Sequence, residues 1–246
     1  MRKSYRELTE EIKTDGERLK LIAALGSSDD LAYHYTLISE DWAAGGTLML
    51  ENSFDRHGEA GIVFLLERLR ALGTASKTDE SAAAGTATGT AYLAAKVLSQ
   101  LRHRDFYAAR AKELAALLTA RWEISDIALR RKQIIALGWI GSESEINLLI
   151  DSMQSDSDAL CRAWAAAALM QLSFHGVAAD VLREKTKAAF AAAIQKEGDL
   201  NAAGIMIEAA QTLFGKKWIS AAAAEAAESE SIEKAGKSAL RFLGKA

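Results

Sequence analysis

The sequence contains no proline, a single cysteine and few aromatic residues. Among its 246 residues, Cys161 is the only cysteine, and Phe, Trp and Tyr together make up 7%. Without proline, the ends of helices must be set by glycine and by polar caps. One cysteine excludes an intrachain disulfide, so we expect a reducing compartment and predict a cytoplasmic protein.

The sequence also lacks a long apolar run and an excess of basic residues. The stretch most like a membrane span, 82–97, consists largely of Ala, Gly and Thr and contains Lys96. Such a segment is too weakly apolar for a bilayer, and residues 1–13 turn acidic too early for a secretory signal. The formal net charge of −3 argues against nucleic-acid binding through a general basic surface but leaves a local patch open.

Half of the residues are apolar, chiefly Ala and Leu, and they recur with the period of a helix. A small or polar residue followed by leucine stands near the end of four expected helices: Ala136-Leu137, Ala168-Leu169, Thr212-Leu213 and Ala239-Leu240. An apolar residue precedes each leucine by eight positions, on the same side of the helix. The leucines are 32, 44 and 27 residues apart, so the repeats are irregular.

Each of these helices has a possible partner helix nearby in the sequence. Expected partners lie at 144–153, 181–194 and 218–227, and upstream pairs are expected within 18–38, at 42–52 with 60–72, and at 81–101 with 105–122. One pair cannot bury its own apolar face, whereas stacked pairs can. We predict an all-α fold, a right-handed solenoid of about five to six hairpins in one domain over 1–246. The alternative is an alanine-rich helical bundle.

One motif occurs twice within 126–172. It reads Asp126, Leu129-Arg130, Ala136-Leu137-Gly138, and then Asp158, Cys161-Arg162, Ala168-Leu169. The motif resembles HEAT-like repeats of the phycobilisome-lyase type, in which Asp, two residues, Val-Arg, alanines and Ala-Leu-Gly precede a second helix. This chain departs from that pattern at Asn147, where such repeats often carry proline. It also departs where Met206 and Glu233 replace the arginine, so 18–122 and 200–246 are expected to be divergent units.

The repeated Asp and Arg are expected to have structural roles. Asp126 and Asp158 stand where a helix begins and can accept hydrogen bonds from free backbone N–H groups, worth about 1 kcal/mol each. Arg130 and Arg162 follow one turn later and can reach an acidic group. The family resemblance implies a ladder of such pairs between repeats.

Other reactive residue types show no pattern of a catalytic or metal site. The four histidines are far apart, so each is expected on the surface or in a loop: His34, His57, His103 and His175. Cys161 stands at an apolar position and is expected to be buried. Gly85 and Gly89 indicate close helix packing. No phosphate loop, nucleophile elbow or dinucleotide fingerprint is present, and we predict neither a cofactor nor a metal.

The leading hypothesis is a non-catalytic scaffold that binds another protein on a concave face lined by the second helix of each pair. By helical phase, the exposed residues of that helix are Leu148, Asp151 and Ser152 in one unit and Arg183 and Lys187 in the next. A monomer is favoured, and the partner is not indicated. Trp164, within a run of small residues, is expected to be buried between units.

Two other functions stay open. An alkylpurine DNA glycosylase built from HEAT-like repeats uses tryptophans and an Asp, and Trp122 and Asp126, with Trp139 and Trp164 further on, resemble that set. The acidic balance of the chain and the capping role of Asp126 count against a DNA-repair enzyme. A small regulatory or immunity-type inhibitor of one protein is the second alternative, and nothing indicates the chromophore of a bilin lyase.

Overall fold

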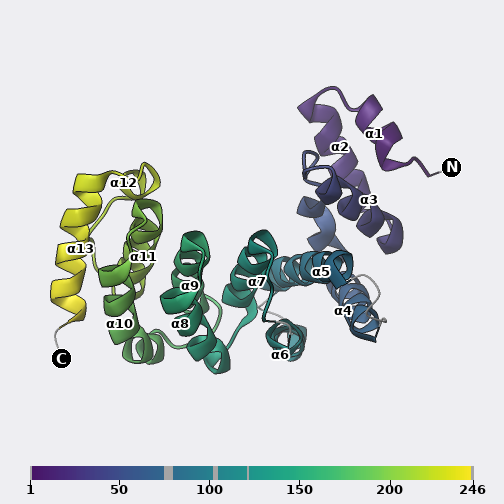
Figure 1. Cartoon of the computed structure of the whole chain (residues 1–246). Coiled ribbons are helices and arrows are strands. Elements are labelled where there is room, and N and C mark those ends of the chain that lie inside the picture. The colour runs from purple at the N-terminus through teal and green to yellow at the C-terminus, as the bar shows by residue number, and fades with distance from the viewer. Residues whose placement is uncertain (1, 75–79, 102–104, 121, 245–246) are drawn as a thin grey trace. The chain divides into compact units, whose positions relative to one another are not determined.

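The structure is a computed structural model that describes residues 2–74, 80–101, 105–120 and 122–244 (Figure 1). All regular elements in these residues are helices, which confirms the predicted all-α solenoid class. The chain divides into two compact units, Met1–Arg110 and Ala111–Ala246. That the whole of 1–246 acts as one domain stays a prediction.

The first unit packs around a short 3₁₀ helix. Its elements are α1 (Tyr5–Glu11), α2 (Asp15–Gly26), α3 (Leu31–Ala43), η1 (Leu50–His57), α4 (Gly58–Thr74) and α5 (Glu80–Leu101). The η1 segment contacts α2, α3, α4 and α5, and it places Leu50 and Phe54 fully inside the core. The helices expected within 18–38, 60–72 and 81–101 are therefore present.

The prediction of a helix at 42–52 is wrong. Helix α3 ends at Ala43, and the backbone then turns through Gly45 and Gly46, whose φ angles are 102° and 70°. Glycine adopts such angles without the steric cost that a Cβ would bring. The buried carboxylate of Asp41 holds the loop by accepting hydrogen bonds from the Leu48 N–H at 3.0 Å and the Tyr5 hydroxyl at 2.8 Å.

The close packing expected from the glycines of α5 is confirmed at Gly89. A Cβ added there would lie 2.9 Å from the indole ring of Trp42. The missing side chain thus makes room for the tryptophan at the end of α3, within the first unit.

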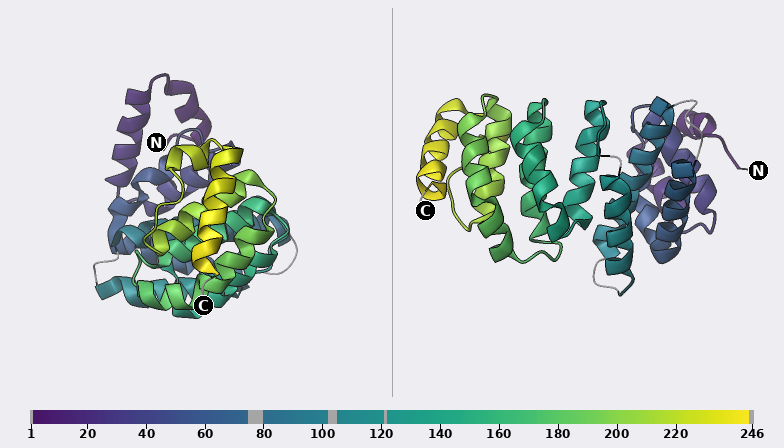
Figure 2. Two further views of the ribbon diagram at one scale, coloured as in Figure 1. Left: turned by 90° about the vertical axis from the view of Figure 1, so that its left-hand side faces the viewer. Right: turned by 60° about the horizontal axis from the view of Figure 1, so that its bottom comes forward.

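The second unit consists of two layers of helices. Its elements after α6 (Asp105–Thr119) are α7 (Ile127–Ile140), η3 (Glu143–Glu145), α8 (Ile146–Ser155), α9 (Ala159–Leu172), α10 (Ala179–Lys196), α11 (Leu200–Leu213), α12 (Ala221–Glu225) and α13 (Ser229–Leu243). The first layer is α7, α9 and α11, and the second layer is α8, α10 and α13. Figure 2 shows these green and yellow helices stacked in chain order.

The three first-layer helices share one length and one kind of cap. Each has 14 residues and follows a capping aspartate: Asp126, Asp158 or Asp199. Leu137 and Leu169 each stand eleven residues after the capping aspartate of their helix, and the residue at that position in α11 is Ala210. Ala210 lies three residues before Leu213. The expected alignment on Thr212-Leu213 is therefore wrong, because it matched residue type and ignored the position at which the helix begins.

The last predicted repeat is also arranged differently. Ala239-Leu240 lies in α13, which packs against α10 and α11 as a second-layer helix. The partner of α11 is thus α13, and not the segment 218–227, in which only the five residues of α12 are helical. Ser220 caps α12, and Ala227 ends this segment with a φ of 49°.

Candidate functional site

Every first-layer helix is anchored at its start by an aspartate. The carboxylate of Asp126 accepts from the Leu129 N–H at 2.9 Å, and Asp158 accepts from the Cys161 N–H at 2.8 Å. Asp199 does the same toward Ala202 at 2.8 Å. The sequence reasoning missed Asp199, although Asp directly before an apolar run was the available signal.

Three arginines connect these helices to the loops that precede the next first-layer helix. Arg130 donates two hydrogen bonds to Asp156 at 2.8 and 2.9 Å, and Arg162 donates two to Glu197 at 2.7 and 2.8 Å. Arg131 makes a third forked pair with Asp158. Such forked pairs fix both distance and orientation. We call these three pairs the ladder.

Asp158 was predicted as a ladder residue, but the acidic partners of Arg130 and Arg162 were not, and these two follow a rule. Asp156 and Glu197 each stand two residues before a capping aspartate. Each also accepts the N–H of that aspartate, at 2.8 Å from Asp158 and 3.0 Å from Asp199. One carboxylate thereby orders the turn and binds the arginine, so the spacing Asp/Glu, any residue, Asp was the signal that sequence reasoning overlooked.

The ladder stabilises the charged forms of Asp158 and Glu197. The Arg131 guanidinium lowers the pKa of Asp158 to about 2, with a further contribution from the Cys161 N–H. Burial alone would raise the pKa of Glu197, but hydrogen bonds from Arg162 and from the Asp199 N–H outweigh it and lower that pKa. The Glu197 hydrogen bonds raise the pKa of Arg162 in turn.

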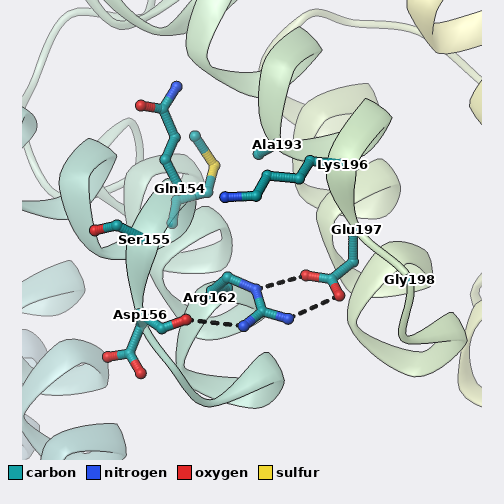
Figure 3. A pocket seen from close by; sticks show the side chains of 9 residues that line it. Gln154, Ser155, Asp156, Arg162, Ala193, Lys196, Glu197 and Gly198 are labelled. Atoms are coloured by element: carbon teal, nitrogen blue, oxygen red, sulfur yellow. Dashed lines mark hydrogen bonds and ion pairs between the residues drawn. The ribbon is translucent and has the colours of Figure 1, made fainter.

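A hollow of about 200 Å³ lies beside the Arg162–Glu197 pair, between the carboxyl ends of α8 and α10. Arg162, Glu197 and Lys196 line it together with Asp156. Figure 3 shows the Lys196 side chain extending from α10 across the hollow, with the Arg162 guanidinium on its other side. The Arg162 side chain is 22% exposed and that of Glu197 only 2%. The cation of the pair is thus its accessible half.

A second surface is formed by the solvent-facing side of the first-layer helices, which we call the solvent face. It comprises the residues two, six, nine and thirteen positions after each cap, and none of them is buried: Ala128, Lys132, Ile135, Trp139, Leu160, Trp164, Ala167, Gln171, Asn201, Ile205, Glu208 and Thr212. The expected burial of Trp164 is wrong, because its side chain points to this face and is 37% exposed.

Comparison with known families gives one match. Residues 80–170 match the family model of HEAT repeats. This segment of the chain is built of HEAT repeats. The match includes α5 and α6, which lie upstream of the motif found twice within 126–172, and it ends within α9. The likeness to the phycobilisome-lyase type stays a resemblance. No curated protein and no solved structure matches the chain.

The second-layer helices α8 and α10 do not expose all of the residues expected to bind a partner. On α8, Asp151 is exposed and Leu148 half-buried, but Ser152 is buried, so its expected exposure is wrong. On α10, Arg183 donates to the Leu213 carbonyl oxygen at 2.7 Å, at the end of α11. The Lys187 ammonium lies 5.9 Å from the centre of the Phe242 ring. Both α10 residues thus contact neighbouring elements of their own unit.

The histidines and the cysteine have different outcomes. His34 is completely buried, so its expected place on the surface or in a loop is wrong, while His57 and His175 are half-buried. His103 lies outside the described residues. Cys161 is buried as predicted, and burial raises the pKa of its thiol to about 11.

The constellation expected of a DNA glycosylase does not lie on one helix of the repeats. Trp122 is in the loop after α6, and Asp126 caps α7 with its carboxylate. The i,i+4 helical spacing of the pair is therefore lost. Within the described residues, no three His, Cys, Asp or Glu side chains are grouped to hold a metal ion, and no helix is long and apolar enough to cross a bilayer.

Proposed function

We propose that the chain is a non-catalytic scaffold that binds another protein through the solvent face of α7, α9 and α11. HEAT repeats are generally protein-interaction modules, and 80–170 are such repeats. The observation that carries the proposal is the exposed indole of Trp164 at the middle of this face. Tryptophan is enriched among the residues that dominate binding energy at protein interfaces.

The surroundings of Trp164 support an apolar contact. On the same helix, Leu160 and Ala167 flank it one turn away in each direction. At the equivalent position on the neighbouring helices, six residues after the cap, stand Lys132 of α7 and Ile205 of α11, both half-buried. Ile135 of α7 lies one turn further along, level with Ala167 and with Glu208 of α11. The apolar centre is thus bordered by one charged residue on each neighbouring helix. An apolar segment of a partner, such as the apolar side of an amphipathic helix, fits this face.

A photo-cross-linking amino acid tests the proposal when it replaces Trp164 in the full chain. The matched control carries it at Phe174, which is 53% exposed after the end of α9. We expect a specific cross-linked protein from position 164 and not from 174. After purification, that protein should bind the unmodified chain and lose about tenfold or more in affinity with Trp164→Ala. Equal binding of the variant would contradict the proposal.

The surface predicted from the second helices, with Leu148 and Asp151, is a weaker candidate. Its other members are buried or contact neighbouring elements, as Ser152 and Arg183 show. Asp151→Lys distinguishes the two surfaces, since it should leave a partner of the Trp164 face bound. We also propose that the scaffold is a cytoplasmic monomer. A regulatory inhibitor of one protein would use the same contact.

The DNA-repair alternative has a direct test. Phosphate contacts make affinity fall steeply with salt, so a DNA glycosylase of this chain would bind duplex DNA at low salt and release it at high salt. We expect no salt-dependent binding, because Arg130, Arg131 and Arg162 are already paired with carboxylates. Base release that vanishes in Asp126→Asn would instead establish the enzyme.

A further inference from the structure

We propose that the hollow between α8 and α10 is a binding site for a carboxylate group, held by Lys196 and Arg162. This site is separate from the solvent face and does not depend on the function proposed for Trp164. Its volume of about 200 Å³ is sufficient for an acidic side chain or a small carboxylic acid.

Among the charged side chains that line the hollow, the Lys196 ammonium is the one without an oppositely charged partner in the described part of the chain. Asp156 and Glu197 each accept two N–H groups from an arginine and one from the backbone, so each of these carboxylates is already paired with a guanidinium. The Lys196 ammonium makes no hydrogen bond or ion pair with any other residue that the structure describes. Its exposed ammonium extends over the hollow in Figure 3.

The ladder pair below Lys196 adds a second donor. Arg162 uses Nε and Nη2 for Glu197 and Nη1 for the carbonyl oxygen of Asp156 at 2.8 Å. Each Nη atom carries two hydrogens, so one N–H remains on each. Because Arg162 is the accessible partner and Glu197 is almost wholly covered, the pair presents its donors to the hollow.

These donors suit a carboxylate more than other ligands. A guanidinium edge and an ammonium group are the usual partners of a planar, singly charged oxyanion. The nearby carboxylates and the carboxyl ends of α8 and α10 carry negative potential, which disfavours a doubly charged phosphate. The single positive charge of Lys196, which is unpaired within the described residues, therefore matches the single negative charge of one carboxylate. It can come from an acidic side chain of a peptide or from a free acid.

Titrations monitored by amide chemical shifts of the full chain test this site. The probes are glutarate, the blocked peptide acetyl-Ala-Ala-Glu-Ala-Ala-amide and its Gln counterpart. We expect saturable shifts confined to 153–156, 162 and 193–198. Shifts with glutarate alone identify a free acid as the source, and shifts with the Glu peptide alone identify an acidic side chain.

The decisive variant is Lys196→Met, which keeps the aliphatic stem and removes the charge. We expect it to weaken binding by about tenfold, while Lys196→Arg retains binding. Lys185→Met is the matched control on the same helix, since Lys185 pairs with Glu143 at 3.5 Å. No saturable shift with any probe, equal binding of the Glu and Gln peptides, or unchanged binding by Lys196→Met would overturn the proposal.

Discussion

At the scale of single residues, the buried histidine pair of the first unit is the clearest titratable feature. His34 Nε2 lies 3.1 Å from the Leu50 carbonyl oxygen, and its Nδ1 lies 2.8 Å from His57 Nε2. A carbonyl only accepts, so His34 carries its proton on Nε2 and accepts from His57 at Nδ1. Burial lowers the pKa of His34 to about 4 and also lowers that of His57.

This pair predicts that stability falls as the pH drops from about 6.5 to about 4. In that range the unfolded chain binds a proton at His34 and the folded chain does not, so acid favours unfolding. Urea denaturation followed by circular dichroism at several pH values measures the slope. In His34→Gln the slope should become shallower, and an unchanged slope would show that His34 does not titrate this way.

The exposure of Trp164 predicts a modest effect on stability. Trp164→Ala should reduce the free energy of unfolding by about 2 kcal/mol or less, because over a third of the side chain already contacts water. Phe190→Ala is the buried comparison, with an expected cost of about 3–5 kcal/mol. Chemical denaturation of both variants measures these losses in the free energy of unfolding. Equal losses would mean that the Trp164 side chain is buried.

At the scale of elements, the ladder predicts that its members depend on one another. Arg162→Ala leaves the Glu197 carboxylate covered and without its arginine, and the expected cost is about 2 kcal/mol or more. In Arg162→Ala with Glu197→Gln, part of that loss should be regained. Arg131→Ala should cost less, because both members of its pair are more exposed. A fully additive double-mutant cycle would contradict this coupling.

The close approach of α7 and α9 at Gly138 leads to a second prediction at this scale. A Cβ at Gly138 would lie 2.8 Å from the Ala168 Cα, where backbone cannot move aside cheaply. Gly138→Ala should therefore destabilise the chain by about 1–3 kcal/mol despite its better helix propensity. Gly236→Ala is the control, since its nearest neighbour is the flexible Ile207 Cδ1 at 3.8 Å. This control should be neutral or stabilising by up to about 1 kcal/mol.

At the scale of the whole molecule, the two compact units predict that local damage stays local. Phe54→Ala removes a fully buried ring from the core of the first unit. Helical repeats contact mainly their neighbours, so amide hydrogen exchange should quicken mostly within 1–110 while α9 and α10 keep their protection. Equal loss of protection in both units would show that they unfold together.

The sequence by itself determined the helical class, two of the three capping aspartates and the two first-layer helices that follow them. These features depend on contacts within one helix, where the 3.6-residue period and the cap chemistry are written locally. Asp126 and Asp158 were found for that reason, and so was the buried position of Cys161.

Only the tertiary structure decided which elements meet. Periodicity shows which side of a helix is apolar, but not which neighbour covers it, so the exposure of Trp164 and the pairing of α13 with α11 stayed hidden. The spacing of Asp156 and Glu197 from the capping aspartates marks both residues in the sequence, but it does not say which arginine each one binds. That choice depends on how neighbouring repeats stack, which brings together segments far apart in the chain.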